Sequence, residues 1–450
     1  MTSKLSSHNV TAFNALNRSC VEMTLSGIRR FANASRWLSK DNSYRVDADK
    51  KVEAEVAAKH IANPRHLAQY IAVSTLHHCT DGWSYLGRAA QALLRGDPHR
   101  ARHLAYYAEL RAAMSLLAAE GIGVFNRSHA IITAPNHASP VKGGGGTHTF
   151  VWDSLAYWAE KGTSGALFTK VVRPYGRDLD EWLVPIGGGA VVGAQAKQWF
   201  IQWGMDLLVL SRDRDARNRS SYQPEGISGS WRIGSAETAS VVSDLWSTLE
   251  PATNSAFDTI DRHILRLTLE SIHKSQTGRA ASASSATYAK LVAKAVGYQG
   301  FSDVVAQEWT SFLRRQMQPN DAPIFILSRL SNDQDKKSSY AVVSRAALLL
   351  RMASGSTSQL FQSAGFDKAS IDFWYKELGP ARGLWNDGSE PENSIDMWSD
   401  IRQSLDDLAM FQADNPGPDH SFYNLASQQG GALGGLAGFE RAMIWSMIPA

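Results

Sequence analysis

Residues 217–222 combine residue types and a spacing that suit the handling of phosphate. The hexad reads Arg-Asn-Arg-Ser-Ser-Tyr, from Arg217 and Asn218 to Tyr222. A guanidinium binds phosphate oxygens, and a phenol can donate a hydrogen bond to the same group. On an α-helix the first and sixth positions lie about 140° apart, so they meet only where the helix ends or a second helix completes the site. The serines and the Pro224 that follow favour a helix end.

The hexad resembles the signature of the HEPN superfamily, whose helical-bundle nucleases carry Arg, a polar residue, three variable residues and then His. Arg217 and Asn218 match the first two positions, and Tyr222 stands where those nucleases have histidine. In the family, the arginine holds the phosphate and the histidine acts as acid or base on the RNA ribose. A phenol, with a pKa near about 10 against roughly 6.5 for imidazole, is a poor base at neutral pH.

The resemblance thus implies a catalytic set of Arg217, Asn218 and Tyr222. Three outcomes are open for it: a Tyr-variant ribonuclease, a binding site without catalysis, or no site at all. In the last case Arg217 and Asn218 would form a hydrogen-bond network at a helix end, with Tyr222 packed beneath it.

The segment 106–122 resembles the helix that packs against the hexad helix in HEPN-type bundles. Glu109 and Arg111 lie among its small and apolar residues. Either one of them is drawn inward to a polar site, or they form a surface pair on opposite sides of the helix. His148 lies at a candidate helix N-terminus, where it would contribute to an anion site, so we treat it as a substrate-binding candidate.

Other polar motifs lack the spacing of known metal or cofactor sites. Gly143–His148 has no lysine of a phosphate-binding loop, and Gly187–Gly193 misses the dinucleotide spacing. His77–Cys79 with Asp81 is followed by no second cluster at zinc-like spacing. We therefore expect no metal and no cofactor.

The composition is that of a globular protein, with 44% apolar and 20% charged residues. The net charge of +3 over 450 residues gives no reason to expect tight non-specific nucleic-acid binding, but it allows a local basic patch. The two cysteines, Cys20 and Cys79, exclude a disulfide framework.

The N-terminus lacks the apolar core of a signal peptide, and no stretch approaches the roughly 18–20 apolar residues of a membrane span. We expect a cytoplasmic protein without membrane contact.

Helical periodicity dominates the chain, and strand signals are few and short. One run of apolar residues with offsets of 3, 7 and 10 is Trp83, Leu86, Ala90 and Leu93. The next run with the same offsets is Tyr107, Leu110, Met114 and Leu117. Gly96–Pro98 predicts the turn between these helices, and the β-branched residues of 130–134 predict a loop or small hairpin. The dispersed tryptophans are interpreted as core anchors.

The predicted class is mostly α, with a HEPN-like helical bundle and additional N- and C-terminal helical regions. We expect a weakly patterned segment over 1–53, a HEPN-like domain over 54–277 and a C-terminal helical domain over 288–450. Gly278–Ser285 has the composition of a linker.

The leading hypothesis is a HEPN-like component of a bacterial antiviral defence or toxin–antitoxin type system that binds RNA or a partner protein. HEPN-like proteins are common in such systems, so the resemblance implies that setting. The alternative is a non-catalytic structural or regulatory subunit that docks a partner, or a second copy of itself, through its C-terminal helices. Leu348–Leu350 and Ala442–Ile448 would form that contact.

Overall fold

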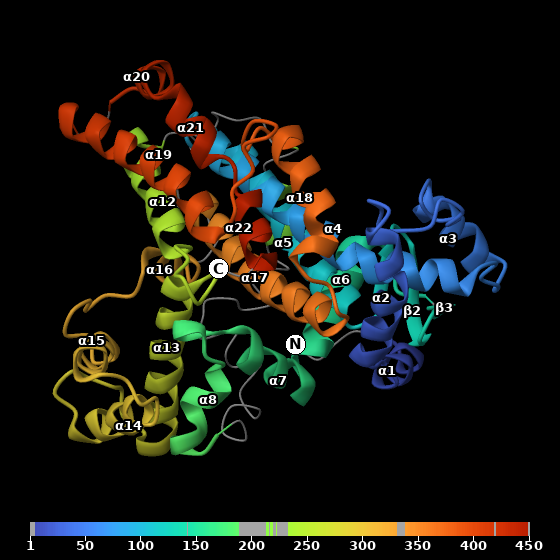
Figure 1. Cartoon of the computed structure of the whole chain (residues 1–450), viewed down its shortest axis with the longest axis horizontal. Coiled ribbons are helices and arrows are strands. Elements are labelled where there is room, and N and C mark those ends of the chain that lie inside the picture. Colours follow the sequence, from blue (N-terminus) through green and yellow to red (C-terminus); the bar gives the residue numbers. More distant parts are fainter. Residues whose placement is uncertain are drawn as a thin grey trace.

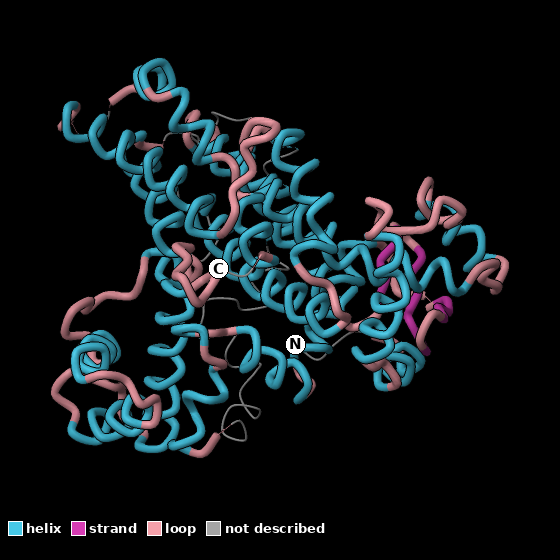
Figure 2. The backbone as a smooth tube through the Cα atoms, in the orientation of Figure 1, coloured by secondary structure: helices cyan, strands magenta, loops and turns pink. Residues whose placement is uncertain are grey.

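The computed structural model is mostly helical, which confirms the predicted class (Figures 1 and 2). It describes residues 5–141, 143–188, 213–215, 217, 218, 222, 233–330, 338–417 and 420–448. Within these residues, no helix has both the length and the apolar character needed to cross a membrane.

The elements follow one another in three groups. The first comprises α1 (Ser7–Asn14), α2 (Arg18–Ala32), α3 (Ala48–Ala57), α4 (Pro64–Leu93), α5 (Pro98–Ala119), β1 (Ile122–Phe125), β2 (Ser128–Ala134) and β3 (His137–Pro140). The second comprises α6 (Thr147–Ala159), α7 (Gly162–Val171), η1 (Pro174–Gly176), α8 (Leu179–Leu183), η2 (Val184–Ile186), α12 (Ser235–Thr248), α13 (Asp258–Thr277), α14 (Ala286–Gly297) and α15 (Asp303–Leu313). The third comprises α16 (Pro323–Leu327), α17 (Ser338–Ser363), α18 (Lys368–Arg382), α19 (Ser394–Asp414), α20 (Phe422–Gln428), α21 (Gly430–Leu436) and α22 (Glu440–Met447).

A hairpin of the long helices α4 and α5 forms the centre of the molecule (Figure 1). Each helix starts with a side-chain cap followed by a proline that needs no backbone partner. The Asn63 side chain accepts a hydrogen bond from the backbone of His66, and the Asp97 side chain accepts one from the backbone of Arg100. Gly96 takes the left-handed conformation (φ 77°) between the helices, which confirms the predicted turn.

The helix α17 packs along both α4 and α5 and completes the core of this bundle. Trp83 of α4 illustrates the packing, because its ring lies parallel to Phe257 and Phe439, with centroid distances of 6.4 and 6.3 Å. Its indole nitrogen donates to Ser354 Oγ of α17 at 2.8 Å. A helix from the expected C-terminal region therefore lies against two helices of the expected HEPN-like region.

The strands form one antiparallel sheet in the order β1-β2-β3 at one end of the bundle (Figure 2). Ile122 pairs with Ile131, and Ile131 pairs with Ser139. The helices α2 and α3 pack against this sheet. Residues 130–134, for which a loop or small hairpin was predicted, lie within β2, the middle strand of this sheet.

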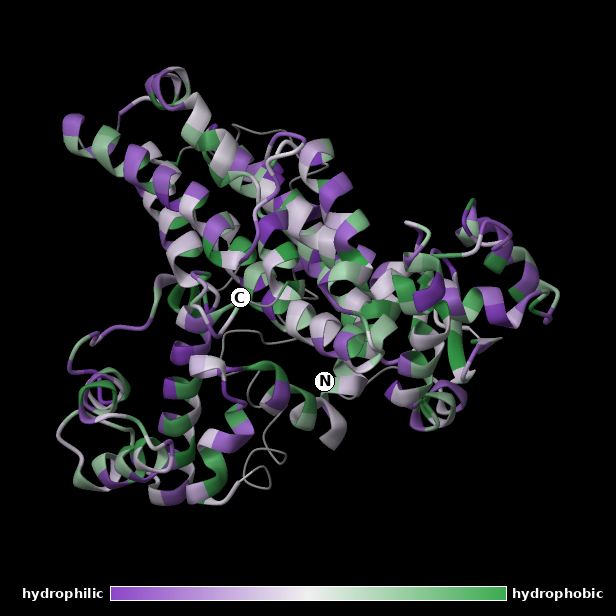
Figure 3. Ribbon diagram, in the orientation of Figure 1, coloured by the Kyte–Doolittle hydropathy of each residue, from purple (hydrophilic) through white to green (hydrophobic). Residues whose placement is uncertain are grey.

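Peripheral helices such as α19 alternate between hydrophobic and hydrophilic residues along their length, as expected for helices with one buried face (Figure 3). The central helices α17 and α22 are buried nearly throughout. Leu348–Leu350 and Ala442–Ile448 belong to this buried part. These residues are therefore core, and the docking surface expected from them is not available on the folded chain.

Candidate functional site

Arg217 lies above two adjacent tyrosines of α5. Its Cζ atom is 5.3 Å from the ring centroid of Tyr106 and 5.7 Å from that of Tyr107. Arg217 and Asn218 are helical and half-buried. The contact expected between the segment 106–122 and the hexad is therefore present, and it consists of a cation held over aromatic faces.

His148, at the second position of α6, reaches the same tyrosines. Its Nδ1 atom lies 2.8 Å from the hydroxyl of Tyr106, which also accepts a hydrogen bond from Trp152 Nε1 at 3.3 Å. Burial raises the pKa of Tyr106, which stays protonated. Because Trp152 Nε1 can only donate, His148 Nδ1 is the acceptor available to the Tyr106 hydroxyl. The remaining ring nitrogen of His148, Nε2, then carries the hydrogen and acts as a donor.

The arginines of the hexad segment act on the histidines around Tyr107. Burial and the charges of Arg217 and Arg214 lower the pKa of His148 below its ordinary 6.5. Burial and Arg217 likewise lower the pKa of His103, whose ring lies 5.1 Å from that of Tyr107. At neutral pH these imidazoles are neutral and the positive charge resides on the arginines, an arrangement that attracts anions.

Tyr222 does not belong to this group. Its side chain is 81% exposed, which contradicts the alternative in which Tyr222 packs beneath a helix end. Residues 219–221 and Pro224 lie outside the described residues. Of the residues proposed from the sequence, the structure brings Arg217 and His148 together and places Tyr222 on the surface.

Two adjoining cavities of about 760 and 530 Å³ continue from this group along α4 and α5. They share the lining residues Arg45, Tyr70, Ser74, His78 and Arg111. We refer to the two cavities together as the α4–α5 cleft. Tyr107 and His148 line one end of it, so the Arg217 group adjoins the cleft.

A hydrogen-bonded pair of His78 and Arg111 lies where the two cavities meet. Arg111 Nη1 is 2.8 Å from His78 Nδ1, and because arginine has no acceptor it must donate this hydrogen bond. The same Nη1 is 3.7 Å from Asp81 Oδ2. Because Nδ1 of His78 accepts the hydrogen bond from Arg111, the hydrogen of the neutral ring is on Nε2, as it is in His148. Of the two residues singled out in this helix, Arg111 faces the cleft and Glu109 is fully buried.

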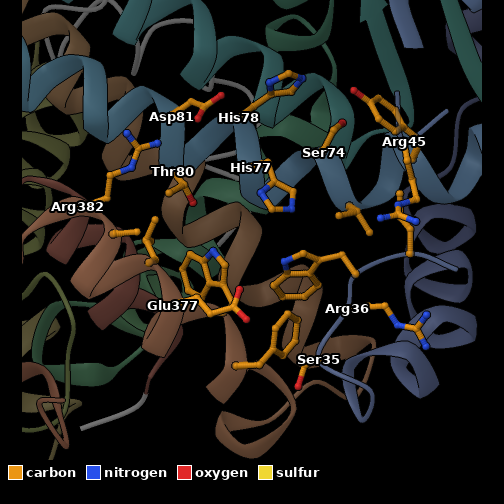
Figure 4. A pocket seen from close by; sticks show the side chains of 18 of the residues that line it. Ser35, Arg36, Arg45, Ser74, His77, His78, Thr80, Asp81, Glu377 and Arg382 are labelled. Atoms are coloured by element: carbon orange, nitrogen blue, oxygen red, sulfur yellow. The ribbon is translucent and has the colours of Figure 1, made fainter. Parts of the chain in front are cut away.

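The opposite wall of the larger cavity comes from the loop after α2 and from α18. Figure 4 shows His77, His78 and Asp81 on α4, with Glu377 and Arg382 across from them and Arg36 to one side. His77 is exposed on the wall of the cleft, and His78 is half-buried. Desolvation by the surrounding protein lowers the pKa of His77 and lowers that of His78 further, with Arg111 adding to the effect on His78.

Aromatic rings are distributed along the whole cleft. Trp37 lies 5.8 Å from the ring of His77 and 5.0 Å from that of Phe373. In the smaller cavity, Tyr85 stacks on Tyr107 at 5.5 Å. The cleft thus offers flat aromatic surfaces between cationic and N–H donor groups.

The structure also shows what the sequence interpretation missed. The sequence suggests His77, His78 and Asp81 only as metal ligands, whereas in the structure they line the cavity of about 760 Å³. The available signal was a run of polar residues within an otherwise apolar helix. In the part of the chain that the structure describes, no three His, Cys, Asp or Glu side chains are grouped so as to hold a metal ion.

Comparison of the chain with protein-family models, curated proteins and solved structures finds no match. The function must therefore be inferred from the Arg217 group and the α4–α5 cleft themselves.

Proposed function

We propose that this protein binds single-stranded RNA in the α4–α5 cleft, with Arg217 and His148 holding phosphate at one end. The observation that supports this most directly is the convergence of Arg217 and His148 over Tyr106 and Tyr107. These residues come from three separate segments and meet where the cleft ends.

The residue types of the cleft match the two needs of a single-stranded nucleic acid. Its phosphates need cations and N–H donors, which Arg217, Arg111 and the Nε2–H groups of His148 and His78 supply. Its bases need flat apolar faces, and base–aromatic stacking contributes about 1–3 kcal/mol per base. Trp37 and the other rings of the cleft provide such faces.

Binding without cleavage fits the geometry better than nuclease activity. A base must have a free lone pair at the reacting hydroxyl, whereas His148 and His78 use Nδ1 as an acceptor within the protein and present a hydrogen on Nε2. Tyr222 is exposed, and a phenol is a poor base at neutral pH. We therefore propose an RNA-binding protein in which the hexad positions phosphate.

The biological setting that we propose, a bacterial antiviral defence or toxin–antitoxin type system, depends on the HEPN resemblance of Arg217 and Asn218 alone. A protein partner or a second copy of the chain also remains a prediction from that resemblance. Either would have to use a surface other than the buried segments Leu348–Leu350 and Ala442–Ile448.

Fluorescence anisotropy with a short labelled single-stranded RNA tests the proposal. We expect Arg217→Ala and Arg111→Ala each to weaken binding roughly tenfold, since each removes charge-assisted hydrogen bonds to phosphate. Arg402→Ala is the matched control, because Arg402 is exposed on α19 and lines neither cavity. No binding by the wild-type protein, or equal loss in all three variants, would refute RNA binding in the cleft.

The same RNA, incubated with and without divalent metal, tests for cleavage. We expect intact RNA with wild-type protein, Arg217→Ala and Tyr222→Phe alike. Cleavage by the wild type that is lost in both variants would instead identify a Tyr-variant nuclease.

A further inference from the structure

A separate cavity of about 380 Å³ lies on another side of α17, between α7, residues 253–257 before α13, the start of α19 and α22. It shares no lining residue with the α4–α5 cleft. Its volume falls in the range of small-molecule sites. Most of its lining side chains are polar, although it reaches deep into the core beside Phe257 and Trp445.

Three residues that line this cavity each carry a buried hydrogen-bond donor with no acceptor among the described residues. The donors are Arg351 Nη1, Trp445 Nε1 and Ser394 Oγ. Their residues are 3%, 1% and 1% exposed. Buried polar groups are nearly always hydrogen-bonded, so three unmatched donors from three helices in one cavity indicate a ligand with several acceptor atoms.

Arg351, which lines the cavity, is held by several contacts that do not involve its Nη1 atom. Its Nε and Nη2 atoms donate to the two carboxylate oxygens of Asp261 at 2.9 and 2.6 Å, and Nη2 also donates to Val171 O at 2.7 Å. Its guanidinium lies 4.5 Å from the ring centroid of Phe257. These contacts leave Nη1 for a ligand, and a side chain at Gly355 would place its Cβ 2.8 Å from Nη1.

The charges at the cavity favour an anion. Lys170, Arg173 and Arg351 line it, against one carboxylate, that of Asp178. Asp178 is shared between two of these cations, at 3.1 Å from Lys170 Nζ and 3.2 Å from Arg173 Nε. Asp261 neutralises Arg351 from behind. Three cationic side chains thus line the cavity itself against one carboxylate, while Asp180, 3.3 Å from Lys170 Nζ, and Asp261 pair with these cations from outside the lining.

We propose that this cavity binds a phosphate group, as free phosphate or as a small phosphate monoester. The three donors come from three different helices, α17, α19 and α22. A phosphate monoester presents three terminal oxygens in three directions, whereas a carboxylate presents two in one plane. The volume beyond that of the phosphate accommodates the organic part of a monoester, with Gln359 and Asn254 available for its polar groups.

Isothermal titration calorimetry of the full chain with inorganic phosphate, adenosine 5′-monophosphate and citrate tests this site. Ser394→Ala and Trp445→Phe each remove one unmatched donor and leave no charge unpaired. We expect both variants to fold normally and to bind phosphate about tenfold more weakly, the loss expected for one hydrogen bond to a charged group.

Matched controls exist elsewhere in the core. Trp309 Nε1 and Ser339 Oγ are likewise buried without a partner among the described residues, but they do not line this cavity. Trp309→Phe and Ser339→Ala should therefore leave phosphate affinity unchanged. Tighter binding of the nucleotide than of phosphate would identify a monoester site, and the reverse would identify a site for free phosphate.

Three results would overturn the proposal. One is no heat of binding with phosphate or the nucleotide. Another is an equal loss of affinity in the cavity variants and the controls. The third is tighter binding of citrate than of either phosphate compound, which would identify a carboxylate site instead.

Discussion

Arg345 forms a two-point ion pair with Asp213 in the interior of the protein. Its Nε and Nη2 atoms each lie 2.8 Å from a different carboxylate oxygen, and both side chains are fully buried. Asp213 precedes Arg217 by four residues in the sequence, and Arg345 belongs to α17. The pair therefore holds Asp213 against the core, close in sequence to the arginine that contacts Tyr106.

Breaking this pair should destabilise the protein strongly. Asp213→Asn removes the carboxylate that hydrogen-bonds the buried guanidinium at two points, for which we expect a loss of about 3–5 kcal/mol in the free energy of unfolding, measured by urea denaturation. Asp47→Asn removes the pair between Asp47 and Lys50, which are 59% and 77% exposed, and should cost less than about 1 kcal/mol. Similar losses in the two variants would show that the buried pair does not hold Asp213 against the core.

The free energy of unfolding should depend on pH, because Glu109 keeps its proton in the folded protein. Glu109 is buried beside the same pair, with Oε1 3.8 Å from Arg345 Nε, and burial together with the charge of Asp213 raises its pKa well above 4.5. The unfolded chain loses this proton as the pH passes 4.5, and the folded chain keeps it. The folded state then binds more protons, so its stability falls as the pH rises between the unfolded and the folded pKa.

Glu109→Gln keeps the shape of the neutral carboxyl and cannot ionise in either state. We expect this variant to match the wild type at about pH 4 and to be increasingly more stable than it towards about pH 8. Urea denaturation across this range measures the difference. A difference that stays constant with pH would mean that Glu109 is ionised in the folded protein.

The sequence predicted the local structure well because periodicity and capping are local properties. Trp83, Leu86, Ala90 and Leu93 are all fully buried, as the offsets along α4 required. The Gly96–Pro98 turn follows from the same local chemistry. Among the described residues, five tryptophans are fully buried, as expected for core anchors.

The site was predicted only in part, because its contacts join distant segments. Nothing local indicates that Arg345 meets Asp213, which lies 132 residues earlier. His148 was proposed for an anion site from its place near a helix start, but its contact with Tyr106 depends on how α6 packs against α5. The resemblance drew attention to Tyr222, whereas the histidine near Arg217 comes from a different helix.

RNA affinity should change with pH through His148. Burial, Arg217 and Arg214 lower its pKa below 6.5, so it is neutral at pH 7 and gains charge only in acid. We expect constant affinity between about pH 7 and 8 and tighter binding below the ordinary imidazole value of about 6.5, at fixed ionic strength. Fluorescence anisotropy measures this profile.

The variant His148→Gln should reduce the increase in affinity at acid pH. The control His8→Gln, at an exposed position of α1, should not reduce it. A transition centred above 6.5 would contradict the lowered pKa.

Gly87 of α4 should tolerate no side chain, because the chain before α22 passes directly over it. A Cβ atom at this position would lie 2.1 Å from the carbonyl oxygen of Ala437, a backbone atom that cannot rotate away. We expect Gly87→Ala to cost about 1–3 kcal/mol or more in the free energy of unfolding.

Gly434→Ala is the control, because Gly434 is an exposed helical residue with nothing within 4 Å of the added Cβ. We expect this variant to raise the free energy of unfolding by up to about 1 kcal/mol. If Gly87→Ala is as stable as the wild type in urea, α4 does not contact the segment before α22, and the arrangement of the core around Trp83 would have to be revised.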